Sequence, residues 1–164
     1  MHLSFFLCFI FTLVMQTIFT HHGYGYSKRL CENVSVWFLN KYLSQYNLHV
    51  DILHRGLKRE HADGYCDMIK RPNKFQIELD TYMDKELYIK TLLHEFTHLR
   101  QWREGRLFLQ YGFMCYSKNK DEVVMVSDYD YFEQPHEIEA REQEELLYHE
   151  YMLSSLVSVS EVAQ

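Results

Sequence analysis

Apolar residues recur at helical spacing in three parts of the chain. The first part, residues 28–46, carries an apolar stripe that consists of Val34, Phe38, Leu39, Tyr42 and Leu43. Asp84 is placed to cap a second helix over residues 85–104, which Gly105 would end. A third helix is predicted from Pro135 to about residue 158, because proline is favoured in the first helical turn.

Between the first two predicted helices the pattern changes to alternation, which is typical of β-strands. Strands are predicted over residues 48–57, 65–70 and 74–79, and in the last of these one face carries Phe75, Ile77 and Leu79. Residues 106–133 are aromatic and rich in turn signals, with a hairpin expected around Ser117–Lys120. This order of elements, with strands gathered between helices, predicts an α+β fold.

The N-terminal segment has a different character. Residues 3–19 are almost continuously apolar, and the first charged residue is Lys28. The run is a little longer than the core of a signal peptide and a little shorter than a spanning helix. We therefore assign residues 1–27 to a signal peptide or membrane anchor and residues 28–164 to one folded domain. That domain would be secreted or membrane-anchored, or cytoplasmic if the start of the chain is misassigned.

Charge and cysteine content exclude several classes of protein. The chain holds 17 Lys and Arg against 23 Asp and Glu, a net charge of −6, whereas nucleic-acid binders carry a basic surface. We therefore expect no nucleic-acid partner. Cys31, Cys66 and Cys115 lie in the predicted domain without Cys-x-x-Cys spacing. The absence of that spacing argues against a zinc knuckle or a redox pair, and we expect three buried thiols.

The second predicted helix contains the most informative motif, His94-Glu95-Phe96-Thr97-His98. Histidines four residues apart project from the same face of a helix, so both imidazoles can reach one ion. Neutral imidazole suits Zn²⁺. Glu95 follows the first histidine directly, which places it beside the ion rather than on it. There it could accept a proton from water at the metal.

A catalytic zinc takes three protein ligands, so a third is expected further along the chain. No histidine lies between His98 and His136, and the next cluster of candidates opens the third predicted helix. Glu139, beside the small Ala140, lies on the rim of the apolar arc of that helix. His136 shares the arc and Glu137 lies off its other edge, so helix geometry alone leaves all three open.

The motif helix followed by a helix that bears Glu139-Ala140 resembles the small gluzincin metallopeptidases, of the ImmA/IrrE type or the short phage-type SprT-like proteins. The resemblance covers residues 67–144. It implies a minimal zincin-like domain with a small sheet, a motif helix and a C-terminal ligand helix. It also implies that Glu139 is the third zinc ligand, and that the strand over Lys74–Asp80 lies above the cleft and pairs with extended substrate.

Two functions follow as hypotheses. The first is a zinc-dependent peptidase, in which His94, His98 and Glu139 hold Zn²⁺ and Glu95 serves as general base and then acid on a peptide or protein substrate. Tyr129 or Tyr131 could supply a phenol to an oxyanion, or both could be packing residues. The second is a non-catalytic, zinc-stabilised domain that binds a partner and closes its site with His136 or His149. In either case residues 3–19 could associate with a membrane.

Overall fold

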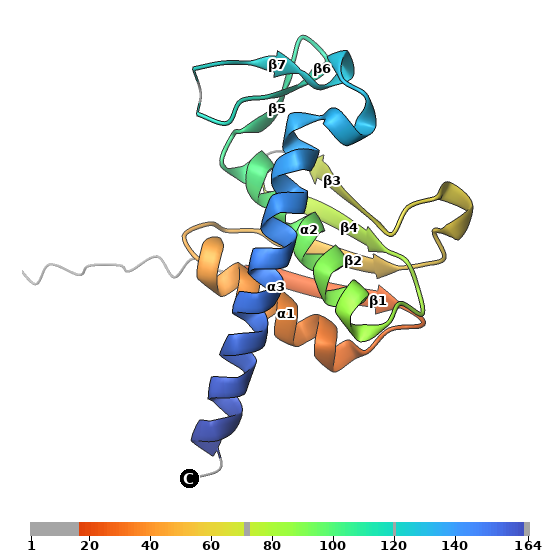
Figure 1. Cartoon of the computed structure of the whole chain (residues 1–164), viewed down its shortest axis with the longest axis vertical. Coiled ribbons are helices and arrows are strands. Elements are labelled where there is room, and N and C mark those ends of the chain that lie inside the picture. Colours follow the sequence, from red (N-terminus) through yellow and green to blue (C-terminus); the bar gives the residue numbers. More distant parts are fainter. Residues whose placement is uncertain (1–16, 71–72, 120, 163–164) are drawn as a thin grey trace, which may run out of the picture.

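The computed structural model describes residues 17–70, 73–119 and 121–162 (Figure 1). The fold is α+β, as predicted. The helices are α1 (Lys28–Tyr42), α2 (Lys85–Arg103) and α3 (Pro135–Val162). The strands are β1 (Ile18–Gly23), β2 (His49–His54), β3 (Gly64–Lys70), β4 (Lys74–Leu79), β5 (Leu107–Gln110), β6 (Phe113–Tyr116) and β7 (Val124–Met125). Short 3-10 turns are η1 (Lys58–Glu60), η2 (Val126–Asp128) and η3 (Tyr131–Glu133).

The larger sheet has the strand order β1-β2-β4-β3. Strands β1, β2 and β4 run parallel, and β3 pairs antiparallel with β4 at one edge. In Figure 1 the helices lie in front of this sheet, and α3 crosses in front of α2. Alternate residues of β4 point toward the helices, and Phe75, Ile77 and Leu79 are fully buried there. The alternation seen in the sequence therefore marks the face that packs on the helices.

Helix α2 is held in the centre of the core. Its apolar residues Ile89, Leu92, Leu93, Phe96 and Leu99 are all fully buried. The ring of Phe96 stacks on Phe38 of α1, with centroids 5.0 Å apart. Asp84 caps the helix as predicted, because its Oδ1 accepts from the Leu87 N–H at 2.9 Å. A buried, capped helix of this kind is a rigid support for the side chains on its polar face.

The folded region begins earlier than residue 28, where the sequence analysis placed its boundary. Strand β1 lies inside the segment assigned to a leader, and it pairs in parallel with β2, from Ile18 with His49 to Gly23 with His54. Phe19 packs against the core from this strand. Residues 1–16, which carry most of the apolar run, lie outside the described residues. Among the helices that the structure describes, none is both long and apolar enough to cross a membrane.

A smaller sheet of β5, β6 and β7 follows α2. The hairpin expected around Ser117–Lys120 is the connection between β6 and β7, although Lys120 itself lies outside the described residues. The sequence analysis missed the hairpin that joins β5 to β6. Its two loop residues, Tyr111 and Gly112, both have positive φ, as a type I′ turn requires. Leu107, Tyr116 and Val126 form a separate small core beneath this sheet.

The three cysteines of the described residues are free thiols. Cys31 and Cys115 are buried as predicted, whereas Cys66 on β3 is only half-buried. Cys66 lies on the helix-facing side of the sheet edge, next to α2.

Candidate metal centre

Helix α2 presents both motif histidines on one face. The Nε2 atoms of His94 and His98 lie 3.1 Å apart, with the two rings inclined at 80°. His98 is buried and His94 is half-buried. The spacing of four residues therefore brings the two imidazoles together, as the sequence predicts.

Glu137, in the first turn of α3, joins the two histidines. Its Oε2 lies 3.3 Å from His94 Nε2, and its Oε1 lies 3.3 Å from His98 Nε2. The ligand atoms of the three residues all lie within 4.8 Å of one another. We call His94, His98 and Glu137 the triad.

The outer nitrogens of both rings face oxygen atoms. His98 Nδ1 lies 2.9 Å from Gln101 Oε1, and His94 Nδ1 lies 3.3 Å from the Glu144 carboxylate. An oxygen acceptor at Nδ1 favours the tautomer that carries its proton there. Both Nε2 atoms then present lone pairs to the centre of the triad, beside the Glu137 carboxylate.

The triad fits a small cation. Two nitrogen lone pairs and a carboxylate face one another, and Glu137 Oε2 is buried without a hydrogen bond among the described residues. A tetrahedral zinc with bonds of about 2.0–2.1 Å separates its ligand atoms by about 3.3 Å. The two Nε2 atoms are 3.1 Å apart, and each lies 3.3 Å from a different oxygen of Glu137, Oε2 for His94 and Oε1 for His98, so each of these pairs is close to that edge length. The donor set of two imidazoles and one carboxylate is also one that zinc accepts.

The pKa values of His94 and Glu137 both favour a positive charge at the site. Burial alone would lower the pKa of His94, but its contacts with Glu137 and Glu144 outweigh burial and raise the pKa to about 9. Burial would raise the pKa of Glu137, yet the neighbouring His94 and His98 hold it well below the usual range. In the absence of a metal, a proton on His94 would balance the carboxylates.

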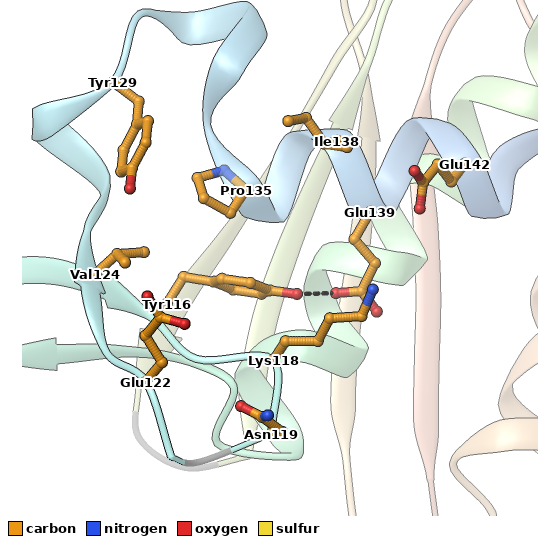
Figure 2. Close-up of a pocket in the computed structure, with 10 residues that line it drawn as sticks. All are labelled: Tyr116, Lys118, Asn119, Glu122, Val124, Tyr129, Pro135, Ile138, Glu139 and Glu142. Atoms are coloured by element: carbon orange, nitrogen blue, oxygen red, sulfur yellow. Dashed lines mark hydrogen bonds between the residues drawn. The ribbon is translucent and has the colours of Figure 1, made fainter.

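Glu139, the third ligand implied by the family resemblance, does not face the histidines. Its carboxylate accepts hydrogen bonds from Arg106, from the Tyr116 hydroxyl at 2.5 Å and from Gln101 Nε2 at 3.0 Å. Figure 2 shows Glu139 and Tyr116 meeting at a separate pocket between α3 and the smaller sheet. Burial would raise the pKa of Glu139, but Arg106 and Tyr116 lower it.

The rotation of α3 about its axis decides which glutamate reaches the histidines. The residues on its α2-facing stripe are Glu137, Ala140, Glu144, Leu147 and Tyr151, which follow one another at intervals of three and four. Glu139 lies beside this stripe. The spacing back from Leu147 and Tyr151 is a signal in the sequence that could have identified Glu137. Of the three candidates that helix geometry left open, Glu137 is the one that lies in the triad.

His136 lies at the border of the triad. Its Nε2 is 3.7 Å from Glu137 Oε1, and its buried Nδ1 has no hydrogen bond among the described residues. Burial, together with the charge of His98, lowers the pKa of His136 to about 4. By contrast, His149 is exposed and contacts Glu145, away from the triad.

Glu95 reaches the edge of the sheet beside the triad. It is 5% exposed, and burial raises its pKa to about 7, against the opposing effect of His98 and His94. Its side chain lies directly over Gly64 of β3, where an added Cβ would meet Oε1 at 2.7 Å and Cγ at 2.9 Å. A residue larger than glycine would therefore displace this carboxyl group.

Two pockets meet at the triad. The larger, about 460 Å³, is bordered by acidic residues that include Glu60, Asp63 and Glu144. The smaller, about 140 Å³, reaches the apolar side chains of Trp102, Leu107 and Met114. Both are lined by Gly64, Tyr65, His94, Glu95, Tyr131 and Glu137. The triad is therefore accessible from two sides.

The two candidate tyrosines have different surroundings. Tyr131 lines both pockets at the triad, and partial burial together with the charges of Glu137 and Glu95 raises its pKa to about 12. Tyr129 lines the separate pocket of Figure 2. Only Tyr131 is placed to act on a ligand at the triad.

The strand next to the triad is β3. The resemblance implied that Lys74–Asp80 lies over the cleft, but β4 is an interior strand with β2 on one side and β3 on the other. An interior strand has no free backbone groups for a substrate. Strand β3, which carries Gly64 beneath Glu95, forms the edge of the sheet at the cleft.

No protein-family model, curated protein or solved structure matches the chain. The function proposed below therefore depends on the motif and on the geometry of the triad.

Gly64→Ala is expected to destabilise the fold by about 1–3 kcal/mol, because its Cβ would overlap the buried Glu95 side chain. Gly56→Ala is the matched control, since its Cβ would meet only the Tyr24 hydroxyl, at 3.6 Å. Urea unfolding of the two variants measures the difference. Equal free energies of unfolding would show that Glu95 does not lie over Gly64 as described.

Proposed function

We propose that the protein is a zinc-dependent peptidase whose metal ligands are His94, His98 and Glu137. The convergence of the two Nε2 atoms, 3.1 Å apart, on the Glu137 carboxylate, which places one oxygen 3.3 Å from each of them, carries this proposal. The partner of each Nδ1 atom supports it, because zinc-bound histidines donate their other N–H to an oxygen acceptor. The proposal that the substrate is a peptide depends on the resemblance of the motif to the gluzincin metallopeptidases.

Each remaining residue of the site has a role in this proposal. A bound zinc supplies the Lewis acidity that activates water and polarises a carbonyl. Glu95 accepts the proton of the attacking water and delivers it to the leaving amine. The Tyr131 phenol donates a hydrogen bond to the oxygen that becomes negative. Within the described residues the outer edge of β3 has no strand partner, so an extended peptide can pair with it.

The pockets on both sides of the triad favour an enzyme over a closed structural site. A structural zinc takes four protein ligands, whereas a catalytic zinc keeps one position open. Space for the two halves of a peptide lies on either side of Glu95 and Tyr131. The small pocket adds the apolar side chains of Trp102, Leu107 and Met114 and the large one adds Glu60, Asp63 and Glu144, so the two halves would meet different surroundings.

Loss of Glu137 is expected to abolish tight zinc binding. In Glu137→Ala the affinity should fall by more than about 100-fold, beyond the effect of losing an outer contact. Glu142→Ala, at an exposed position of the same helix, is the matched control and should bind zinc as the wild type does. Calorimetric titration of the full chain with zinc measures both. A wild-type chain that takes up no zinc would contradict the proposal.

Glu95→Gln should retain zinc and fold but lose hydrolysis by about 10²–10⁴-fold or more, because an amide cannot accept the proton of water. Glu86→Gln, on an exposed position of the same helix, is the control. Cleavage of denatured casein and autolysis during storage provide the assays, with metal content measured in parallel. Undiminished cleavage by the Glu95 variant would refute this role.

A second function is favoured by the position of His136. With its Nε2 near Glu137 and its Nδ1 unpaired among the described residues, His136 could serve as a fourth ligand of a non-catalytic, zinc-stabilised domain that binds a partner. The two functions differ in the effect of His136→Ala on the zinc dissociation constant. We expect a change of less than about 10-fold for an open site. A loss as large as that of Glu137→Ala would favour the structural domain.

A further inference from the structure

Gln101 connects the triad to a buried polar network. It lies on α2 three residues after His98 and is fully buried. Both ends of its amide are used. Oε1 contacts His98 Nδ1 at 2.9 Å, while Nε2 donates to the His136 carbonyl at 2.9 Å and to Glu139 Oε2 at 3.0 Å.

The partners of Gln101 fix which way its amide points. A backbone carbonyl and a carboxylate can only accept hydrogen bonds, so the end that faces α3 must be the NH₂ group. Oε1 therefore faces His98. Because Oε1 is an acceptor, His98 donates from Nδ1, and in the neutral ring its Nε2 carries the lone pair.

Glu139 also accepts hydrogen bonds from two further residues. Arg106 donates to the carboxylate and also contacts Glu104, and Tyr116 donates its hydroxyl hydrogen at 2.5 Å. Figure 2 shows the Tyr116 hydroxyl directed at Glu139. Arg106 immediately precedes β5 and Tyr116 ends β6, so one donor belongs to the smaller sheet and the other to the residue that leads into it. The network thus runs from this sheet through α3 to a motif histidine on α2.

We propose that Gln101, oriented by Glu139, is a positioning residue that holds His98 in its Nδ1–H tautomer so that Nε2 is free to bind the metal. This inference rests on the metal site of the proposed function. It gives Glu139 a role in the metal site although its carboxylate does not face the triad. It also accounts for the attachment of the smaller sheet to this end of α3, since that sheet holds Glu139 in place.

The tautomer of His98 is the direct test, and it needs no metal. Long-range ¹H–¹⁵N NMR spectra of the metal-free chain distinguish a protonated Nδ1 from a protonated Nε2. In Gln101→Met, which keeps the length of the side chain but removes its acceptor and donors, the Nδ1–H preference should be lost. Zinc affinity should fall by about 10–100-fold, the usual effect of losing such a partner.

Leu147→Ala is the matched control for loosened packing between α2 and α3. Leu147 is buried on the stripe of α3 that faces α2 but does not belong to the polar network. The variant should be less stable than wild type while its His98 tautomer stays unchanged and its zinc affinity falls less than that of Gln101→Met. If it alters both as much as Gln101→Met does, Gln101 acts only by joining the helices and the proposal is wrong.

The double variant Gln101→Glu/Glu139→Gln exchanges the two groups and provides a rescue. The new carboxylate at position 101 can accept from His98 Nδ1, and the new amide at position 139 can donate to it and to the Tyr116 hydroxyl oxygen while its own oxygen faces Arg106. The one partner lost is the His136 carbonyl, which a carboxylate at position 101 cannot serve as donor. We expect the Nδ1–H tautomer to return and zinc affinity to recover to within about 10-fold of wild type. If Gln101→Met does not fold, the double variant tests the proposal instead. Failure of His98 to keep the Nδ1–H tautomer in the double variant would overturn the proposal.

The outcome is separable from that of the proposed function. A wild-type chain that binds no zinc, but whose His98 tautomer depends on Gln101, would refute the metal site and leave the positioning role intact. A chain that binds zinc equally well with and without Gln101, with an unchanged tautomer, would refute the positioning role and leave the metal site intact.

Discussion

The packing of α3 on α2 is the contact on which the whole site depends. Ala140 is fully buried on α3 and presents only a methyl group, so the two helices can approach closely. Further along, Leu147 and Tyr151 anchor α3 in the same core that buries α2. This one interface brings Glu137 to the Nε2 atoms of both histidines and Glu144 to the Nδ1 atom of His94.

Around this interface the protein buries several carboxyl groups, which is costly unless each meets a hydrogen-bond donor or a positive charge. Glu139 meets Arg106, Tyr116 and Gln101. Glu137 meets two histidines, and Glu95 is left with a raised pKa of about 7. The compensation therefore differs from group to group. Glu139 is fully paired and suited to a structural role, whereas Glu137 and Glu95 are arranged as a ligand and a proton acceptor would be.

The two sheets support the site from opposite sides. The larger sheet places Gly64 at its edge, where the absence of a side chain leaves room for Glu95. The smaller sheet contributes Tyr116, and the residue before its first strand is Arg106, so this sheet holds the first turn of α3 through Glu139. The triad and Glu95 therefore lie toward β3, and the supporting network lies toward β5 and β6.

Interactions between residues close in sequence determined the helix boundaries and the pairing of the motif histidines. Helix caps, proline at a helix start and the His-Glu-x-x-His spacing all act within a few residues. Asp84, Pro135 and the pairing of His94 with His98 were predictable for that reason. The third member of the triad was harder to identify, since Glu137 and Glu139 lie about 160° apart around a helix and the packing of α3 on α2, of which the sequence carries only the spacing of Leu147 and Tyr151, selects between them. Strand β1 was missed for a similar reason: its place beside β2 is a long-range pairing that the apolar N-terminal pattern conceals. Periodicity fixes which face of an element is apolar, but contacts between distant segments decide how that element is rotated and which strand lies beside it.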